Sequence, residues 1–230
     1  LQWHETHECD LHCRHCYDRT KRDRLPVEKA LAVLEDLDQF CKNMSVRGHV
    51  CFTGGNPFLY PDLFRIYRAV SDKGFSTSIL GNPVSTERLR QLAAIRKPGY
   101  FQVSLEGLKE HNDNIRGKGS YDRVMGFLDV LKDEGISSAV MLTLTKDNID
   151  QVLPLAEILK DRAEYYTFNR LSPVGEGASL HLPGKDRYEN FLREYVEASR
   201  TNPVMGYKDN LINVVLRQNG EKLFEGCTGY

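Results

Sequence analysis

The sequence lacks any long hydrophobic run. No apolar stretch approaches the ~20 residues that a membrane-spanning helix needs. A charge excess of either sign is also missing, because 31 Lys and Arg residues face 32 Asp and Glu residues and the formal net charge is −1. Such a chain has no broad basic surface for nucleic acid or an anionic membrane. With 40% hydrophobic and 27% charged residues, its 230 residues predict a soluble globular protein with no membrane or nucleic-acid partner.

An initial Met and a secretory signal are missing as well. The chain begins at Leu1, and no charged segment followed by an apolar one comes after it. We therefore expect this sequence to be a piece of a longer protein. Without a sign of secretion, its six cysteines are not expected to form the disulfide framework of a small protein from an oxidising compartment. Another role has to explain them.

Strand-like and helix-like segments alternate along most of the chain. Short β-prone segments lie at residues 2–6, 49–52, 75–80, 100–105, 138–144 and 165–171. Helical spacing follows from Pro26 onward and at residues 62–73, 86–96, 121–134 and 149–162. Crossovers of this length imply parallel strands with helices outside. We predict an α/β fold, a partial (β/α)6 TIM-like barrel.

A change of composition marks the end of this alternation. Residues 172–185 are rich in Gly, Pro and Ser. We predict a barrel domain over residues 1–180 and a small C-terminal appendage over residues 181–230. Within the appendage we expect a helix at residues 186–200, a strand at 213–216 and a hairpin near 217–223.

The segments after the predicted strands are expected to meet. In open or closed α/β sheets the ligand site lies at the carboxyl ends of the strands. This sequence has a cysteine-rich loop and four glycine-containing segments at such ends, namely residues 8–17, 53–57, 81–82, 104–107 and 170–175.

Three of the six cysteines form the motif C-x-x-x-C-x-x-C at Cys9, Cys13 and Cys16. A loop with this spacing can hold three irons of an iron–sulfur cube and leave the fourth iron open, whereas an ordinary ferredoxin cube has four cysteines. Zinc is the alternative, with His4, His7, His12 or His15 as fourth ligand. The spacing favours the cluster, because zinc sites usually show a second Cys pair and none is present.

These cysteines stand in a wider set of motifs that follow one another in order. They are Cys9/Cys13/Cys16, Thr53-Gly54-Gly55-Asn56-Pro57, Val103-Ser-Leu-Glu-Gly107, His111-Asn112, Arg116-Gly117, Gly119-Ser-Tyr-Asp122 and Arg170-Leu-Ser-Pro-Val-Gly175. Together they resemble the radical S-adenosylmethionine (radical SAM) enzymes over about residues 3–180. More narrowly, they resemble the branch with a C-terminal auxiliary-cluster extension of the SPASM or twitch type, which includes peptide maturases.

The resemblance implies a role for the cysteines and for the glycine segment. Cys9, Cys13 and Cys16 would hold a [4Fe–4S] cluster whose open iron is chelated by the amino and carboxylate groups of S-adenosylmethionine. Gly54 and Gly55 would lie against the methionyl amino group through backbone oxygens, because glycine permits close backbone approach. Asn56 and Pro57 of the same segment are also predicted to belong to the cofactor site. A tight turn without a ligand is the alternative. The family usually has Glu where this chain has Asn56.

Two further residues match positions that contact the cofactor in the family. Ser104, at the end of its strand, matches a cofactor-contacting position. Arg116 could offer a bidentate fork to the methionyl carboxylate. The alternatives are structural, with Ser104 as a cap and Arg116 in a surface ion pair.

The nucleoside end of the cofactor is expected to meet other side chains. The resemblance places Asn82 and Asn148 near the ribose and His15 beside the adenine, and it places Tyr17 after the third cysteine. Turn formation is the alternative for both asparagines, and packing against the cluster loop is the alternative for Tyr17.

The resemblance also implies a reaction and its partners. A reductant such as flavodoxin or ferredoxin would load the cluster with one electron, and cleavage of S-adenosylmethionine would give a 5′-deoxyadenosyl radical. This radical would abstract hydrogen from a ribosomally synthesised peptide, which makes the protein a peptide-modifying oxidoreductase. A folded protein substrate, as in sulfatase maturation, and a small-molecule cofactor precursor remain alternatives, and a zinc-stabilised binding protein is the alternative outside enzymes. The oxygen sensitivity of an open cluster predicts a cytoplasmic location.

The three isolated cysteines have separate expectations. Cys41 and Cys51 are expected to be packing residues, since they lie on an apolar helix stripe and inside a short strand. Cys227 lies in Gly226-Cys-Thr-Gly-Tyr230, which looks like the opening of an auxiliary-cluster extension. We predict that it ligates an auxiliary Fe–S cluster in the intact protein, where partner cysteines would be needed.

Overall fold

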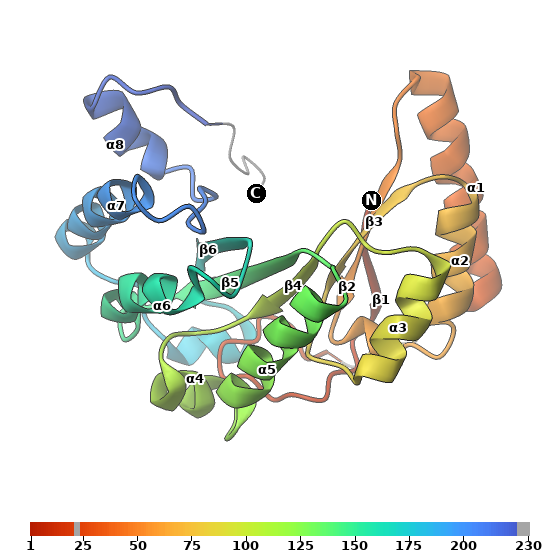
Figure 1. Ribbon diagram of the computed structural model, residues 1–230, viewed down its shortest axis with the longest axis horizontal. Coiled ribbons are helices and arrows are strands. Elements are labelled where there is room, and N and C mark those ends of the chain that lie inside the picture. The colour runs from red at the N-terminus through yellow and green to blue at the C-terminus, as the bar shows by residue number, and fades with distance from the viewer. Residues whose placement is uncertain (21–23, 225–230) are drawn as a thin grey trace. The chain divides into compact units, whose positions relative to one another are not determined.

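The computed structural model describes residues 1–20 and 24–224. Its strands form a six-stranded sheet in the order of the chain: β1 (Gln2–Thr6), β2 (His49–Gly54), β3 (Ser76–Leu80), β4 (Phe101–Ser104), β5 (Ser138–Leu144) and β6 (Tyr165–Arg170) (Figure 1). The pairs β1–β2, β2–β3, β3–β4 and β5–β6 run parallel. The predicted α/β fold with six sequential parallel strands is confirmed.

Helices follow the strands, close to the predicted ranges. They are α1 (Val27–Met44), α2 (Leu63–Asp72), α3 (Thr86–Ile95), α4 (Lys109–Arg116), α5 (Ser120–Asp133), α6 (Val152–Leu159), α7 (Lys185–Ser199) and α8 (Ile212–Gln218). Three short 3-10 helices also occur, at Pro57–Leu59, Ile149–Gln151 and Gly175–Ser179. Helix α4, which covers the predicted motif around His111 and Arg116, was not expected from the sequence.

The chain divides into two compact units. The first unit comprises Leu1–Leu11, Arg19–Val103 and Gly126–Ser138, and the second comprises His12–Asp18, Ser104–Met125 and Ala139–Tyr230. The division places Cys9 in the first unit and Cys13 and Cys16 in the second. The predicted boundary after residue 180 stays a sequence prediction.

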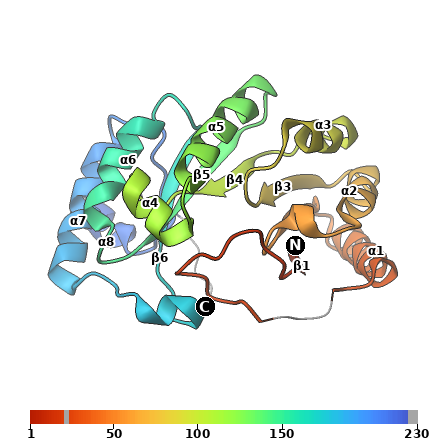
Figure 2. The ribbon, with the colours of Figure 1, turned by 90° about the horizontal axis from the view of Figure 1, so that it is seen from below.

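Aromatic packing between strands and a helix forms the core of the first unit. Trp3 on β1 is paired with Phe52 on β2, and their rings stack with centroids 6.4 Å apart. Phe52 also contacts Tyr67 on α2, with ring centroids 5.3 Å apart. All three side chains are buried. Helices α1, α2 and α3 lie beside β1, β2 and β3 (Figure 2), and this layer holds the carboxyl ends of the three strands in place.

In the second unit, β5 is an almost continuous apolar run. Six of its seven residues are buried, as is typical of a parallel strand that is covered on both faces. The neighbouring β6 contributes Phe168, which makes edge-to-face contacts with Phe191 and Tyr195 of α7 at centroid distances of 5.2 and 4.9 Å. Helix α7, which the sequence predicted, is thereby packed against β6.

The predicted strand at residues 213–216 and the hairpin after it are wrong. Residues 212–218 form α8, which buries Ile212, Val215 and Leu216, a spacing that fits one face of a helix. The turn at Asn219 and Gly220 ends this helix. Gly220 has φ of 71°, its N–H donates to the oxygen of Arg217, and the N–H of the next residue donates to the oxygen of Leu216, which is a Schellman cap.

A different segment extends the sheet after β6. Tyr166 forms a parallel bridge with Met205, supported by hydrogen bonds from Tyr166 N to the oxygen of Val204 and from Gly206 N to the oxygen of Tyr166. A Cβ on Gly206 would lie 1.8 Å from the Tyr165 ring. Glycine is therefore required for this close approach.

No helix in the described part of the chain is both long enough and apolar enough to cross a membrane.

Candidate cofactor site

In the first unit, the glycine segment after β2 lies directly against the start of the cysteine loop. The N–H of Gly55 donates to the oxygen of Thr6 at 2.8 Å, and a Cβ on Gly55 would lie 2.1 Å from the oxygen of Glu8. Gly54 has φ of 130°, and its Cβ would lie 2.3 Å from the oxygen of Thr6. Both glycines are thus needed for contact between two backbones, a reason that holds with or without a ligand.

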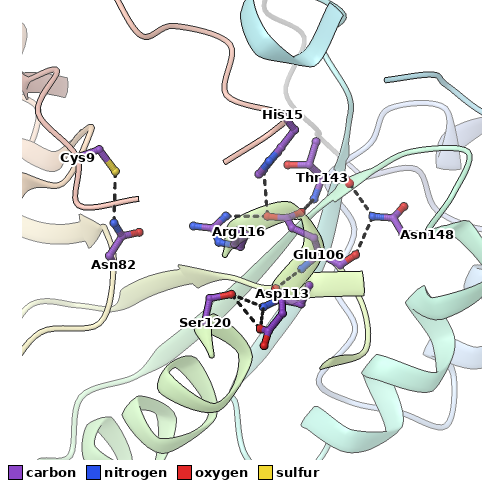
Figure 3. Close-up of polar contacts among 10 residues, drawn as sticks. Cys9, His15, Asn82, Glu106, Asp113, Arg116, Ser120, Thr143 and Asn148 are labelled. Atoms are coloured by element: carbon purple, nitrogen blue, oxygen red, sulfur yellow. Dashed lines mark hydrogen bonds and ion pairs between the residues drawn. The ribbon is translucent and has the colours of Figure 1, made fainter. Parts of the chain in front are cut away.

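Polar residues from three strand ends of the first unit meet at Asp10. The Nδ2 of Asn56 and the Nδ2 of Asn82 donate to the same oxygen, Oδ1 of Asp10, at 2.8 and 2.7 Å. Both asparagines are buried. Asn82 Nδ2 also donates to Cys9 Sγ at 3.4 Å (Figure 3). The predicted convergence of the segments after β1, β2 and β3 is therefore present, and Asn82 contacts the first cysteine of the motif.

In the second unit, residues 12–18 of the cysteine loop are held by two other segments. The N–H of Arg14 donates to the oxygen of Ile115 in α4 at 3.0 Å. The N–H of Glu176, after β6, donates to the oxygen of Cys16 at 2.9 Å. A Cβ on Gly175 would lie 2.4 Å from the oxygen of Tyr17. The Arg170 to Gly175 motif thus leads into a segment that packs against the loop.

The same unit contains a buried ionic cluster centred on Glu106. Arg116 Nη1 donates to Glu106 Oε1 at 2.7 Å, His15 Nε2 lies 3.1 Å from the same oxygen, and the N–H of Thr143 donates to Oε2 at 2.8 Å (Figure 3). Burial by itself raises the pKa of the Glu106 carboxyl, but His15 and Arg116 favour the charged form and bring the pKa down to about 2. Glu106 is therefore a buried anion.

Two residues predicted to contact the cofactor, Arg116 and His15, each contact Glu106 in this cluster. Arg116 binds Glu106 through Nη1, and its side chain is 10% exposed. It is therefore in a buried ion pair and not in the surface pair considered as an alternative. His15 contacts Glu106 through Nε2. Ser104 is the last residue of β4. The contacts of these residues with the methionyl carboxylate and the adenine stay predictions.

Asn148 has its amide engaged by the backbone of the second unit. Its Oδ1 accepts from the N–H of Thr145 at 2.7 Å, and its Nδ2 donates to the oxygens of Glu106 and Thr143, each at 2.9 Å. These contacts join the segment after β4 to that after β5. They favour the turn role over contact with the ribose.

The motif at residues 111–122 has a structural explanation. Asn112 Oδ1 accepts from the N–H of Glu106 at 3.0 Å, and its Nδ2 donates to Ser120 Oγ at 2.8 Å. Asp113 accepts hydrogen bonds from the N–H groups of Gly119 and Tyr121 at 2.7 and 2.9 Å. These residues connect α4 with the start of α5 and hold Glu106 in place.

The donor chemistry of the cysteine loop fits an iron–sulfur cluster. Cys9, Cys13 and Cys16 form no disulfide, and their side chains are exposed or intermediate. Cluster sulfurs are commonly tuned by N–H donors such as that of Asn82. Within residues 1–20 and 24–224, no group of three or more His, Cys, Asp or Glu side chains is placed so that it could hold a metal ion. The assignment of the three ligands therefore rests on their spacing and stays a prediction.

The remaining cysteines differ in their surroundings. Cys41 is buried on α1, as predicted, whereas Cys51 in β2 is only partly buried. Cys227 lies outside the described residues, so its predicted role in an auxiliary cluster stays a prediction.

Three acidic residues of these regions were not singled out from the sequence. Asp10 lies between the first two cysteines, Glu106 lies within the Ser-Leu-Glu-Gly motif, and Glu5 is buried in β1. An acidic residue at a buried strand position was the available signal for Glu5. The partners of Asp10 and Glu106 come from segments distant in sequence and required the structure.

The parallel sheet and the thiol loop at its carboxyl edge define an α/β protein of the kind that places a ligand at the strand ends. The family model of the radical SAM superfamily matches residues 6–159 of this chain. The chain belongs to this superfamily, whose cofactors are a [4Fe–4S] cluster and S-adenosylmethionine.

Similar proteins include two relatives of different substrate chemistry. The Fe-coproporphyrin III synthase of Methanosarcina barkeri is 28% identical over 186 residues, 77% of this chain and 45% of the relative. The mycofactocin maturase MftC of Mycolicibacterium smegmatis is 31% identical over 185 residues, 78% of this chain and 46% of the relative. This chain thus spans about half the length of the curated relatives it matches.

A solved structure has the same fold. SuiB of Streptococcus suis, bound to the precursor peptide SuiA, matches with a TM-score of 0.67 and 18% identity, over 99% of this chain and 48% of that one. At this identity the likeness concerns the fold alone.

Proposed function

We propose that this chain is the radical-generating core of an enzyme that modifies a ribosomally synthesised peptide. The observation that carries the proposal is the loop after β1 with three cysteines outside disulfides, in a chain of the radical SAM superfamily. When bound, the cluster and S-adenosylmethionine supply a 5′-deoxyadenosyl radical that abstracts hydrogen from carbon.

The chain's own residues would hold and shape this site. Cys9, Cys13 and Cys16 would bind three irons. Asn82 would stabilise negative charge on the first of these sulfurs through its N–H. The strand ends would orient the cofactor and exclude water from the reacting carbon.

The positively charged Arg116 and the buried anion Glu106 would help to position the loop that carries the second and third cysteines. Glu106 holds Arg116 and contacts His15, which precedes Cys16. A paired guanidinium keeps a fixed orientation, which is what recognition of a carboxylate requires. In this proposal Arg116 faces the methionyl carboxylate and His15 the adenine.

A peptide substrate is supported by the kind of proteins that resemble this chain. Relatives include mycofactocin maturase MftC and the subtilosin biosynthesis protein AlbA of Bacillus subtilis, and SuiB has been solved with its precursor peptide. In the same proposal the intact protein carries an auxiliary Fe–S cluster that uses Cys227, and flavodoxin or ferredoxin supplies the electron.

A tetrapyrrole substrate is the second candidate. It is favoured by relatives of comparable identity, the Fe-coproporphyrin III synthase at 28% and the AdoMet-dependent heme synthase of Methanosarcina barkeri at 24%. The site residues described above do not separate the two substrate classes.

The test uses the full-length protein, purified without oxygen. We expect at least about four irons per chain, in keeping with one cubane, and release of 5′-deoxyadenosine with dithionite and S-adenosylmethionine. Cys13→Ala should lower the iron content by about the four irons of one cubane and abolish the release of 5′-deoxyadenosine, while Cys41→Ala, which changes a buried cysteine of α1, should leave the iron content unchanged. A colourless, zinc-containing wild type would contradict the proposal and favour a binding protein.

The substrate is tested separately. A peptide encoded beside the gene is co-expressed with the enzyme and its mass is measured, and an iron coproporphyrin is incubated with the same enzyme. A changed peptide mass supports the first candidate. An unchanged peptide together with a converted porphyrin supports the second.

A further inference from the structure

Arg170, the last residue of β6, is held by a buried carboxylate that lies between α7 and α8 in the chain. Its Nε donates to Asp209 Oδ2 at 2.7 Å. The same oxygen accepts from the hydroxyl of Tyr188 at 2.6 Å, and Oδ1 accepts from the N–H of Leu211 at 2.8 Å. The Asp209 side chain is only 3% exposed. Both of its oxygens are therefore fixed within the second unit, and Arg170 has a rigid anchor.

The far end of the Arg170 side chain is open. The side chain is 42% exposed, and among residues 1–20 and 24–224 no group accepts a hydrogen bond from Nη1 or Nη2 and no second carboxylate pairs with the guanidinium. Arg116 of the same unit differs, because its side chain is 10% exposed and its Nη1 binds the buried Glu106. Arg170 thus presents two terminal nitrogens in a fixed orientation without an ionic partner for them.

Arg170 lies at the edge of the sheet where a ligand is expected. It is paired with Leu144, the last residue of β5, and ligands of α/β sheets bind at the carboxyl ends of the strands. The segment that follows Arg170 returns to the cysteine loop, because the N–H of Glu176 donates to the oxygen of Cys16 at 2.9 Å. The open guanidinium and the third cysteine therefore belong to the same edge of the second unit.

We infer that Arg170 binds a carboxylate group of the substrate through Nη1 and Nη2. This inference rests on the proposed function and names the group by which the site recognises its substrate. Two parallel N–H groups match the two oxygens of a carboxylate, and such a charge-assisted pair fixes the orientation as well as the position of the ligand. Hydrogen abstraction from one particular carbon requires a substrate that is held in this way.

Asp209 is the positioning residue of this pair. It accepts from Nε alone, which leaves the terminal nitrogens of Arg170 free for a ligand. An arginine that is held in one orientation before binding loses less side-chain entropy when the substrate arrives. The buried carboxylate of Asp209 therefore strengthens substrate binding without touching the substrate.

The carboxylate has two sources, one for each candidate substrate. A peptide carries carboxylates on its Asp and Glu side chains and at its C-terminus, and an iron coproporphyrin carries them on its propionate groups. Arg170 recognises the same chemical group in both, so the experiment has to contain both probes.

The test measures substrate binding by the anaerobic, cluster-loaded full-length protein. The probes are the peptide encoded beside the gene and iron coproporphyrin III, and the one that the wild type binds identifies the source. Each has a version without carboxylates, which is a peptide with all acidic side chains and the C-terminus amidated, or the tetramethyl ester of the porphyrin. We expect Arg170→Gln to raise the Kd of the bound probe at least about tenfold. The version without carboxylates should bind the wild type as weakly, and Arg170→Gln should not weaken it further.

A second variant and a matched control complete the test. Arg170→Lys keeps the positive charge but not the paired N–H groups, so its affinity should lie between those of the wild type and Arg170→Gln. Arg193 on α7 is 46% exposed, but its Nη2 already binds Glu189, and Arg193→Gln should bind the probe with the wild-type Kd. The iron content of all three variants should equal that of the wild type, because the cysteines are unchanged.

Two results would overturn the inference while leaving the proposed function intact. One is an unchanged Kd of the bound probe in Arg170→Gln. The other is an equal loss of affinity for the version without carboxylates, which would make Arg170 a support of β6 only. A wild type that binds neither probe would overturn both candidate substrates and the inference with them, even if it releases 5′-deoxyadenosine.

Discussion

Glu5 in the first unit and Glu106 in the second are both buried carboxyl groups, with exposures of 3% and 1%, yet their environments are opposite. Within the described residues, neither side-chain oxygen of Glu5 has a hydrogen-bond partner, and burial raises the pKa of its carboxyl to about 9. Both oxygens of Glu106 are engaged. Although burial alone raises the pKa of Glu106, His15 and Arg116 lower it to about 2.

The comparison shows that burial does not decide the charge of a carboxyl group by itself. Transfer from water penalises the anion in both places, and only Glu106 has a guanidinium, an imidazole and a backbone N–H to offset the penalty. At neutral pH Glu5 therefore carries a proton and Glu106 does not. The anion Glu106 lies in the second unit, where it contacts Arg116 and His15, two residues that are predicted to bind the cofactor.

The largest effect is expected for Glu106→Gln. The substitution keeps the shape but leaves the Arg116 guanidinium, 10% exposed, without its anion. Breaking a buried ion pair on one side costs about 3–5 kcal/mol of unfolding free energy. Urea unfolding at pH 7 measures the loss, and Glu110→Gln on the exposed side of α4 is the control. Equal stability of both variants would contradict the role of Glu106.

The same pair predicts how this loss depends on pH. The pKa of Glu106 falls from 4.5 in the unfolded chain to about 2 in the folded protein, so its contribution is complete above pH 4.5 and is lost as the pH decreases towards 2. The difference between wild type and Glu106→Gln should therefore shrink over this range. A difference that grows on acidification would contradict the direction of the pKa shift.

Glu5→Gln is expected to have the next largest effect, with the opposite sign. The folded protein keeps a proton on Glu5 up to pH 9, whereas the unfolded chain releases it above 4.5. Stability from this group is therefore greatest below pH 4.5 and decreases as the pH rises to about 9. Gln abolishes this dependence and should add up to about 3 kcal/mol at pH 7.

Urea unfolding of Glu5→Gln at pH 5, 7 and 8.5 measures this gain. The advantage over wild type should increase along that series, and Glu110→Gln should show no such trend. A variant less stable than wild type at all three values would mean that Glu5 is charged and paired in the folded protein.

A smaller effect is expected for Asn82→Ala, which removes a hydrogen bond to the Cys9 sulfur and changes the midpoint potential of the cluster. Asn82 donates to Cys9 Sγ, and such a donor stabilises the more negative, reduced cluster. Its removal in Asn82→Ala should shift the midpoint potential to more negative values by ~40 mV, the equivalent of about 1 kcal/mol for one electron. A redox titration followed by EPR measures the shift, with Asn43→Ala on α1 as control. A positive shift would contradict the role of the donor.

Much of this fold could be predicted from the sequence because alternating periodicity is a local signal. The strands at residues 2–6 and 138–144 were placed at their observed bounds. Residues 213–216 were misread because a short apolar run fits a strand and a buried helix equally. The segment that actually extends the sheet, at residues 204–206, is too short to have a period of its own.

The candidate site was predictable to a different extent. Cysteine spacing and the position of motifs after strands placed the start of the cysteine loop and the glycine segment together, as the hydrogen bond from Asn56 N–H to the oxygen of Glu8 bears out. The hydrogen bonds of Asp10 and the partners of Glu106 depend on how separate segments meet. A residue type alone does not tell a protonated Glu5 from an ionised Glu106.

The smallest effect is expected at a surface ion pair with nearly the same geometry as the buried one. Lys109 Nζ lies 2.6 Å from Asp122 Oδ2, compared with 2.7 Å between Arg116 and Glu106, but its partners are 58% and 61% exposed. Water and salt screen such a pair, and ordering two long side chains offsets the attraction. Lys109→Gln should therefore leave the urea midpoint unchanged within error at low and high salt. A loss like that of Glu106→Gln would mean that distance, and not burial, sets the strength of both pairs.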